Sequence, residues 1–219
     1  MLDSVVCVYR SGGDFSHHDV NRLHRQIRAN LTDYVRFYCL TDDIWQDYSP
    51  GVTVLRMWTN LPRWWGKVDM WNPRLAEMFG RAFYLDLDTL IIGNIDDIAA
   101  YSGERPLITA DWYHGGPSQS LLIYTPNQFE RVWRKFQQSP QHWMREGDRM
   151  HCPNWGDQIL LREQCDMEFN YFQDVFPGRL ASYKATLKCQ PPEGDDVTII
   201  CFHGKPRPQE AEPWVRKYL

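Results

Sequence analysis

An apolar run that leads directly into two aspartates constrains this chain more than any other feature of its sequence. The run 82–85 (Ala-Phe-Tyr-Leu) is followed by Asp86 and Asp88, and a second apolar run begins at Leu90. A short continuous apolar run is typical of a strand in a sheet whose two faces are both covered. We therefore predict a buried strand over residues 82–85, with two carboxylates at its carboxyl end.

The two aspartates can be interpreted in two ways. In open α/β sheets, ligands bind outside the carboxyl ends of the strands, which is where Asp86 and Asp88 are expected. Carboxylates beside an apolar core cost free energy unless they are neutralised, and a divalent cation prefers such oxygen ligands. Alternatively, both residues belong to a turn or a cap on a solvated edge, because turns favour aspartate. This stretch alone leaves both interpretations open.

Strand and helix signals alternate along the chain, which predicts a parallel sheet with helices on its faces. Residues 139–153 are polar and are expected to be irregular. The chain has 219 residues, without internal repeats or a linker, so a single domain over residues 1–219 is predicted. Besides 82–85, the predicted strands cover residues 4–9, 35–40, 52–57, 106–110, 120–124 and 197–202.

Two helices are predicted from agreeing start signals. Ser16 with Asp19 three residues later is a variant of the capping box, and an apolar stripe of helical spacing follows it. Thr125 with Gln128 three residues later is a second capping box, with proline at the first helical position. We expect Pro73 to break or kink a third helix, since proline is unfavourable in a helix interior.

Charge and hydropathy argue against a nucleic-acid-binding protein and against a membrane-spanning one. The net charge is −4 and there is no long basic run, so nucleic acid is not the favoured partner. No run approaches the ~20 apolar residues of a membrane helix, so we expect no transmembrane segment. The N-terminus lacks the basic and apolar regions of a signal peptide. A cytoplasmic protein is expected.

The cysteines agree with a reducing compartment. Cys7, Cys39 and Cys201 each lie inside an apolar run, as small buried residues do. No C-x-x-C pair occurs, so a zinc ribbon is not predicted, although Cys152 and Cys165 form a loose cluster with His151.

A second polar cluster follows the last predicted strand. His203 and Lys205 come directly after residues 197–202. If this strand and the strand 82–85 belong to one sheet, His203 can converge with Asp86 and Asp88 on one ion. Two carboxylates and one imidazole suit Mn²⁺ or a similar cation, with positions left for substrate oxygens. Taken alone, His203 would be interpreted as a structural histidine.

Four motifs occur along the chain in a characteristic order. They are Trp64-Trp65-Gly66-Lys67, the D-x-D motif at residues 86–88 with its hydrophobic tail and downstream acidic turn, Gly156-Asp157-Gln158, and Phe202-His203-Gly204-Lys205-Pro206. In this order they resemble the GT-A glycosyltransferases of the glycogenin-like (family 8) group, and the resemblance spans nearly the whole chain.

The resemblance implies a fold and an activity. The fold would be α/β, a single GT-A (Rossmann-like) domain with a mixed, mostly parallel central sheet flanked by helices. The activity would be that of a metal-dependent hexosyltransferase, with Mn²⁺ or Mg²⁺ as cofactor. The donor would be a nucleotide-sugar, with a UDP-hexose as the first candidate, and the acceptor a glycan, a lipid-linked sugar or a protein. Transfer would retain the anomeric configuration.

The resemblance also implies roles around the diphosphate. Asp88 and His203 would bind Mn²⁺, and Asp86 would be shared between the metal and the ribose. Lys205 and Lys67 would face the diphosphate or the sugar.

Further roles concern the sugar and the base. Asp157 and Gln158 would lie beside the transferred sugar as the catalytic pair, and the choice between a covalent intermediate and front-face attack stays open. Tyr9 and Phe15 are the candidates to stack on the base. One departure is Ser118-Gln119-Ser120, where the family often has Asn-Ser-Gly or Asn-Ser-Ser, with Gln119 as the candidate replacement for the asparagine.

Two alternatives belong to other functional classes. Asp86 to Thr89, continuing to Leu90, also fits the D-x-D-x-T pattern of haloacid-dehalogenase-like phosphatases, with Asp86 as the nucleophile. In that group the motif ends the first core strand, whereas three predicted strands precede it here. A protein that binds a nucleotide-sugar or glycan without turnover is the other alternative.

Overall fold

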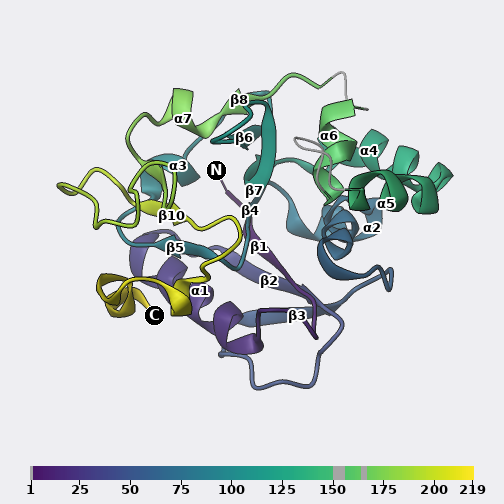
Figure 1. Cartoon of the computed structure of the whole chain (residues 1–219). Helices are drawn as coiled ribbons and strands as arrows, with labels where there is room; N and C mark the ends of the chain where they lie inside the picture. The colour runs from purple at the N-terminus through teal and green to yellow at the C-terminus, as the bar shows by residue number, and fades with distance from the viewer. Residues whose placement is uncertain (1, 150–155, 164–166) are drawn as a thin grey trace.

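The computed structural model describes residues 2–149, 156–163 and 167–219 of the chain. The loose cluster of His151, Cys152 and Cys165 lies outside these residues. Within these ranges the strands form a central sheet of seven and a small sheet of three (Figure 1). Within the described residues, Cys7, Cys39 and Cys201 are buried free thiols, as predicted.

The central sheet is mixed and mostly parallel, which confirms the predicted fold class. Among the strands of this sheet in the described residues, only β7 (Pro117–Tyr124) runs antiparallel to its neighbours, β4 (Ala82–Leu85) and β6 (Leu107–Ala110). The predicted strands 4–9 and 82–85 match β1 (Ser4–Tyr9) and β4 residue for residue. The strand order is β3 (Val52–Arg56), β2 (Arg36–Thr41), β1 (Ser4–Tyr9), β4 (Ala82–Leu85), β7 (Pro117–Tyr124), β6 (Leu107–Ala110) and β8 (Asn170–Tyr171).

Both faces of this sheet are covered, which explains the continuous apolar run of β4. Phe83 and Leu85 pack into the core on one face, and Ala82 and Tyr84 pack into the core on the other. Figure 1 shows α1 on one side of the sheet and α2, α4 and α5 on the other. The helices are α1 (His17–Asn30), the 3₁₀ helix η1 (Arg63–Trp71), α2 (Pro73–Phe79), α3 (Asp96–Ala99), α4 (Pro126–Gln138), α5 (Pro140–Asp148), η2 (Gly156–Gln158), α6 (Ile159–Glu163) and α7 (Phe172–Val175).

The small sheet corrects one premise of the sequence analysis. It consists of β5 (Thr89–Ile91), β10 (Ile199–Cys201) and β9 (Leu180–Ser182), in that order from β5, so β10 does not share a sheet with β4. The loop after β10 nevertheless reaches the D-x-D motif, because β5, which follows this motif, pairs antiparallel with β10. The Phe202 N–H donates to the Asp88 carbonyl at 3.3 Å. Two short 3₁₀ helices follow, η3 (Pro208–Glu210) and η4 (Pro213–Tyr218).

The helix signals were correct at two starts and incomplete elsewhere. Ser16 with Asp19 and Thr125 with Gln128 both form capping boxes at the starts of α1 and α4. The expected break at Pro73 is confirmed, because η1 ends at Trp71 and Pro73 begins a separate helix, α2, with Asn72 as its N-cap. The segment predicted to be irregular contains α5. None of the helices formed by the described residues has the length and apolar character that a bilayer crossing requires.

Candidate active site

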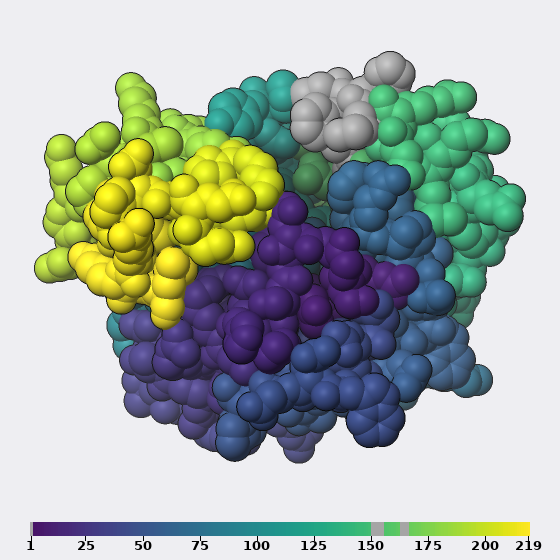
Figure 2. Space-filling view, turned by 60° about the horizontal axis from the view of Figure 1, so that its bottom comes forward, coloured from purple at the N-terminus to yellow at the C-terminus, as the bar shows by residue number. Residues whose placement is uncertain are grey.

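A cavity of about 940 Å³ opens at the carboxyl ends of β1 and β4. Segments from many parts of the chain line it, so residues far apart in the sequence meet there. In Figure 2 the surface is hollowed where the purple N-terminal and yellow C-terminal parts of the chain meet the blue segment. The lining includes residues 10–15, 62–64, 86–88, 111–114 and 156–158, with Lys67, Lys184, His203, Gly204 and Arg207.

Most of the predicted site residues line this cavity, and two do not. Phe15, Lys67, Asp86, Asp88, Asp157, Gln158 and His203 are among its lining residues. Tyr9 is buried in the apolar core and is not among them, so its position does not fit the predicted stacking on a base. Lys205 is also absent from the lining, because its ammonium pairs with Glu210 at 2.8 Å on the surface.

Asp86 is held by groups from three elements. Its backbone N–H donates to the Ser120 carbonyl of β7 at 3.0 Å, directly after β4 ends. Its carboxylate accepts from the Tyr84 hydroxyl and pairs with the Lys67 ammonium at 2.6 Å. Burial would lower the pKa of Lys67, but the charges of Asp86, Asp157 and Asp88 outweigh burial and raise it, so Lys67 is a permanent cation of the site.

Asp88 is buried and faces a different cation. Its Oδ2 pairs with the Arg207 guanidinium at 2.5 Å and accepts from the Gly204 N–H at 3.4 Å. Burial and the neighbouring Asp86 charge raise the pKa of Asp88, while Arg207 and Lys67 oppose this shift. The two carboxylates of the D-x-D motif therefore repel each other, and each has its own positive partner.

The backbone of the turn that carries these aspartates is held by Arg22, a buried residue of α1 that was not predicted from the sequence. The Arg22 guanidinium donates to the Leu87 carbonyl at 2.5 Å and to the Thr89 carbonyl at 2.9 Å. These two carbonyls flank Asp88 in the chain. Arg22 is therefore a positioning residue, because it sets the backbone of the turn without lining the cavity.

Asp157 is another carboxylate on the cavity. It is 4% exposed, and its Oδ2 has no hydrogen-bond partner among the described residues. Burial raises the pKa of Asp157 to about 6, with Lys67 lowering it and Asp86 raising it. The Gln119 side-chain amide donates to the Asp157 carbonyl at 3.4 Å, so Gln119 supports this segment.

The raised pKa of Asp157 makes a prediction about stability and pH. A carboxyl in an unfolded chain titrates near about pH 4, so between about pH 4 and pH 6 the folded chain binds more protons than the unfolded chain. Stability contributed by this group therefore falls as the pH rises through that window. Asp157→Asn removes the ionised form and is expected to raise the free energy of unfolding by about 1–3 kcal/mol at neutral pH.

Urea unfolding between about pH 4 and pH 7.5 checks this prediction. The wild type and Asp157→Asn are expected to have similar free energies of unfolding at the acid end of this range. The difference between them is expected to grow as the pH rises. Asp195→Asn, at an exposed aspartate, is the matched control. A difference that stays constant with pH contradicts the assignment to Asp157.

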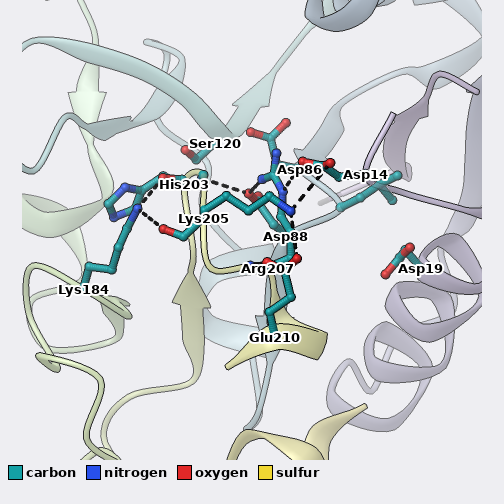
Figure 3. Close-up of polar contacts among 12 residues, drawn as sticks. Asp14, Asp19, Asp86, Asp88, Ser120, Lys184, His203, Lys205, Arg207 and Glu210 are labelled. Carbon is teal, nitrogen blue, oxygen red and sulfur yellow. Dashed lines mark hydrogen bonds and ion pairs between the residues drawn. The ribbon is translucent and has the colours of Figure 1, made fainter. Parts of the chain in front are cut away.

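His203 lies apart from the two aspartates. Its Nε2 contacts the Ser182 Oγ at 2.5 Å, and its ring stacks on Trp112 with centroids 5.2 Å apart. Burial and the Lys184 charge lower the pKa of His203 to about 4, so the ring is neutral. Figure 3 shows His203 beside Lys184, on the far side of Asp88 from Asp14.

The positions of Asp86, Asp88 and His203 decide whether the site can hold a divalent cation. Within residues 2–149, 156–163 and 167–219, no three His, Cys, Asp or Glu side chains are gathered as a metal-binding group. The pair Asp86 and Asp88 nevertheless fits a hard cation, because Mg²⁺-like ions are commonly bound by one or two carboxylates together with substrate phosphates and water. His203 as a ligand stays a prediction, since its Nε2 is turned to Ser182.

Besides Arg22, three candidates on the cavity itself were not predicted from the sequence. Arg207 directly follows the Lys-Pro motif. This position beside a recognised motif was the signal that could have identified it as a site residue. Trp112 and Lys184 line the same cavity but belong to no motif. Only the fold brings them to the site.

Comparison with known proteins adds information on the fold alone. No protein-family model matches the sequence, and no curated protein has a significant sequence match to it. Solved structures do match.

Two glycosyltransferases illustrate the match. The glycosyltransferase GlyE from Streptococcus pneumoniae TIGR4 superposes with a TM-score of 0.67 at 13% identity, over 99% of this chain but only 59% of the GlyE chain. The galactosyltransferase LgtC, solved with donor and acceptor sugar analogs, gives a TM-score of 0.67 at 11% identity, over 98% of this chain and 93% of LgtC. An LgtC active-site mutant with glutamate in place of glutamine gives a TM-score of 0.65 at 10% identity. The chain therefore has the GT-A fold of glycosyltransferases such as GlyE and LgtC, as its motifs predicted.

Proposed function

We propose that this protein is a glycosyltransferase that moves a hexose from a nucleotide-sugar to an acceptor, with a UDP-hexose as the first donor to test. The observation that carries the proposal is the gathering of Asp86, Asp88 and Asp157 with Lys67 on one cavity at the carboxyl ends of the parallel strands. Open α/β sheets bind nucleotides in this position. LgtC, which has the same fold, was solved with donor and acceptor sugar analogs.

The diphosphate end of the donor is assigned to the D-x-D motif. Asp86 and Asp88 would hold Mn²⁺ or Mg²⁺, which supplies Lewis-acid stabilisation of the charge that develops on the leaving diphosphate. Asp86 is also proposed to contact the ribose, with the Lys67 ammonium holding its carboxylate in place at 2.6 Å. Phe15 is the remaining candidate to stack on the base, since it lines the cavity.

The sugar end is assigned to Asp157 and Gln158. Cleavage of the bond to the diphosphate gives the anomeric carbon oxocarbenium character, which a nearby carboxylate stabilises. Asp157, with a pKa of about 6, is ionised at neutral pH and lies within the field of Lys67. Retention of configuration is proposed from the family resemblance, and the acceptor is a glycan, a lipid-linked sugar or a protein.

A panel of donors in a thermal-shift experiment tests the proposal. A ligand that binds only the folded chain raises its stability by about 2.7 kcal/mol at 100 times its dissociation constant. UDP-hexoses with Mn²⁺ are expected to raise the unfolding temperature more than GDP- or CDP-sugars with Mn²⁺, and more than UDP-hexoses with a chelator. No shift with any nucleotide-sugar would overturn the proposal.

Two further measurements separate the alternatives. Slow metal-dependent hydrolysis of the bound UDP-sugar distinguishes a transferase from a protein that only binds its ligand. Release of phosphate from p-nitrophenyl phosphate, without any nucleotide, would favour a phosphatase that uses Asp86 as the nucleophile. The pairing of Asp86 with Lys67 and Tyr84 argues against that role, because it holds the carboxylate in place.

A further inference from the structure

The side chain of Arg207 enters the donor site from the C-terminal loop. Its Nη1 pairs with Asp88 Oδ2 at 2.5 Å, and its Nε pairs with Asp14 Oδ2 at 3.1 Å. The guanidinium carbon lies 4.6 Å from the centroid of the Phe15 ring. Figure 3 shows Arg207 between Asp88 and Asp14, whereas the Lys205 ammonium pairs with Glu210 at 2.8 Å and with Asp14 at 3.7 Å but not with Asp88. Arg207 is thus the cation of this loop that reaches the predicted position of the diphosphate.

The backbone on both sides of Arg207 is anchored, so its side chain is the part that can change partner. The Lys184 ammonium donates to the His203 and Lys205 carbonyls, each at 2.9 Å. The Arg207 N–H donates to the Glu210 carboxylate at 2.8 Å. A side chain with several rotatable bonds on a fixed backbone can move its guanidinium without unfolding the loop.

The charges around Asp88 require such a change when a cation binds. Arg207 neutralises Asp88 in the chain alone, where the side chain of Asp88 is 7% exposed. A divalent ion at Asp86 and Asp88 would take over this neutralisation and would repel the guanidinium at the same oxygen. The planar guanidinium fork matches phosphate oxygens, which arrive together with the ion.

Resting on the function proposed above, we propose that Arg207 is a diphosphate-binding residue of this site, which Asp88 holds until a divalent cation takes its place. The ligand class is a nucleoside diphosphate, and Arg207 supplies the positive charge that Lys205 was expected to supply. Arg207 therefore competes with the metal when no nucleotide is present and assists the metal when the diphosphate is bound.

Opposite changes in two affinities test this proposal. Binding of Mn²⁺ alone is followed by electron paramagnetic resonance, and binding of UDP at saturating Mn²⁺ by calorimetry. Arg207→Gln is expected to bind Mn²⁺ alone about tenfold more tightly, because the competing guanidinium is gone, and UDP about tenfold more weakly, because a charge-assisted hydrogen bond to the diphosphate is lost. Arg207→Lys keeps the charge without the fork and is expected to fall between the two.

The control and the outcomes separate this proposal from the proposed function. Arg216→Gln, at an exposed arginine near the C-terminus, is expected to behave as the wild type in both assays. If the wild type binds UDP with Mn²⁺ but Arg207→Gln matches Arg216→Gln, the role of Arg207 is overturned while the function stands. If Arg207→Gln weakens both affinities together, exchange at Asp88 is overturned. If the wild type binds no nucleoside diphosphate with Mn²⁺, the function is overturned and this proposal with it.

Discussion

Asp88→Asn is expected to abolish the metal-dependent binding of UDP while the chain stays folded. Changes in the outer shell of a metal site already cost about 10–100-fold in affinity, so loss of a carboxylate ligand is expected to cost at least about 100-fold. The fold should tolerate the change because burial and Asp86 already raise the pKa of Asp88, so a neutral amide of the same shape relieves both costs. Calorimetry with UDP and Mn²⁺ measures the affinity, and thermal unfolding checks the fold.

The matched control for this experiment is Asp195→Asn, which makes the same chemical change on the surface. It should bind UDP with Mn²⁺ as the wild type does. If Asp88→Asn binds UDP with Mn²⁺ as tightly as the wild type does, the assignment of the metal to the D-x-D motif is wrong.

Arg22→Ala is expected to lower the free energy of unfolding by about 3 kcal/mol, because two buried carbonyls lose their donors at a cost of about 1–3 kcal/mol each. The bonds concerned join the guanidinium to Leu87 and Thr89. Because these residues flank Asp88, the variant is also expected to weaken UDP binding. Urea unfolding measures the first effect, and calorimetry with Mn²⁺ and UDP measures the second.

Two comparisons make this prediction specific. Arg28→Ala removes an exposed arginine from the same helix, where its guanidinium lies 4.6 Å from the centroid of the Tyr34 ring, so only a small loss is expected. Arg22→Lys keeps a buried charge with a single donor group and should restore part of the stability. An Arg22→Ala chain as stable as Arg28→Ala would show that the two carbonyls do not depend on Arg22.

The parts of the fold that the sequence predicted correctly depend on local chemistry. The strand 82–85 is apolar on both faces because both faces are covered, so its pattern alone indicates a buried strand. Ser16 and Thr125 start their helices through side-chain bonds that reach only three residues along the chain. The D-x-D motif directly follows this strand, so the position of the site could also be predicted from local sequence.

The parts that were missed depend on contacts distant in sequence or on weak local patterns. Arg22 and Arg207 act through partners at positions 87–89, and their sequence neighbours give no signal for Arg22 and only the adjacent Lys-Pro motif for Arg207. Helix α5 buries Trp143 and Gly147, too few apolar residues to form a recognisable stripe. The common sheet expected for β4 and β10 was wrong because a partner strand cannot be assigned from the strand's own composition.

The pairing of β5 with β10 has a consequence for the order in which the protein is made. Residues 89–91 leave the ribosome before their partner strand at 199–201, which is made more than a hundred residues later. Contacts of such long sequence separation form late and slowly during folding. The central sheet can therefore assemble on a nascent chain while the turn with Asp88 still lacks the Phe202 amide and the Arg207 guanidinium. Nucleotide-binding competence is expected to appear only after residues 199–207 have been synthesised.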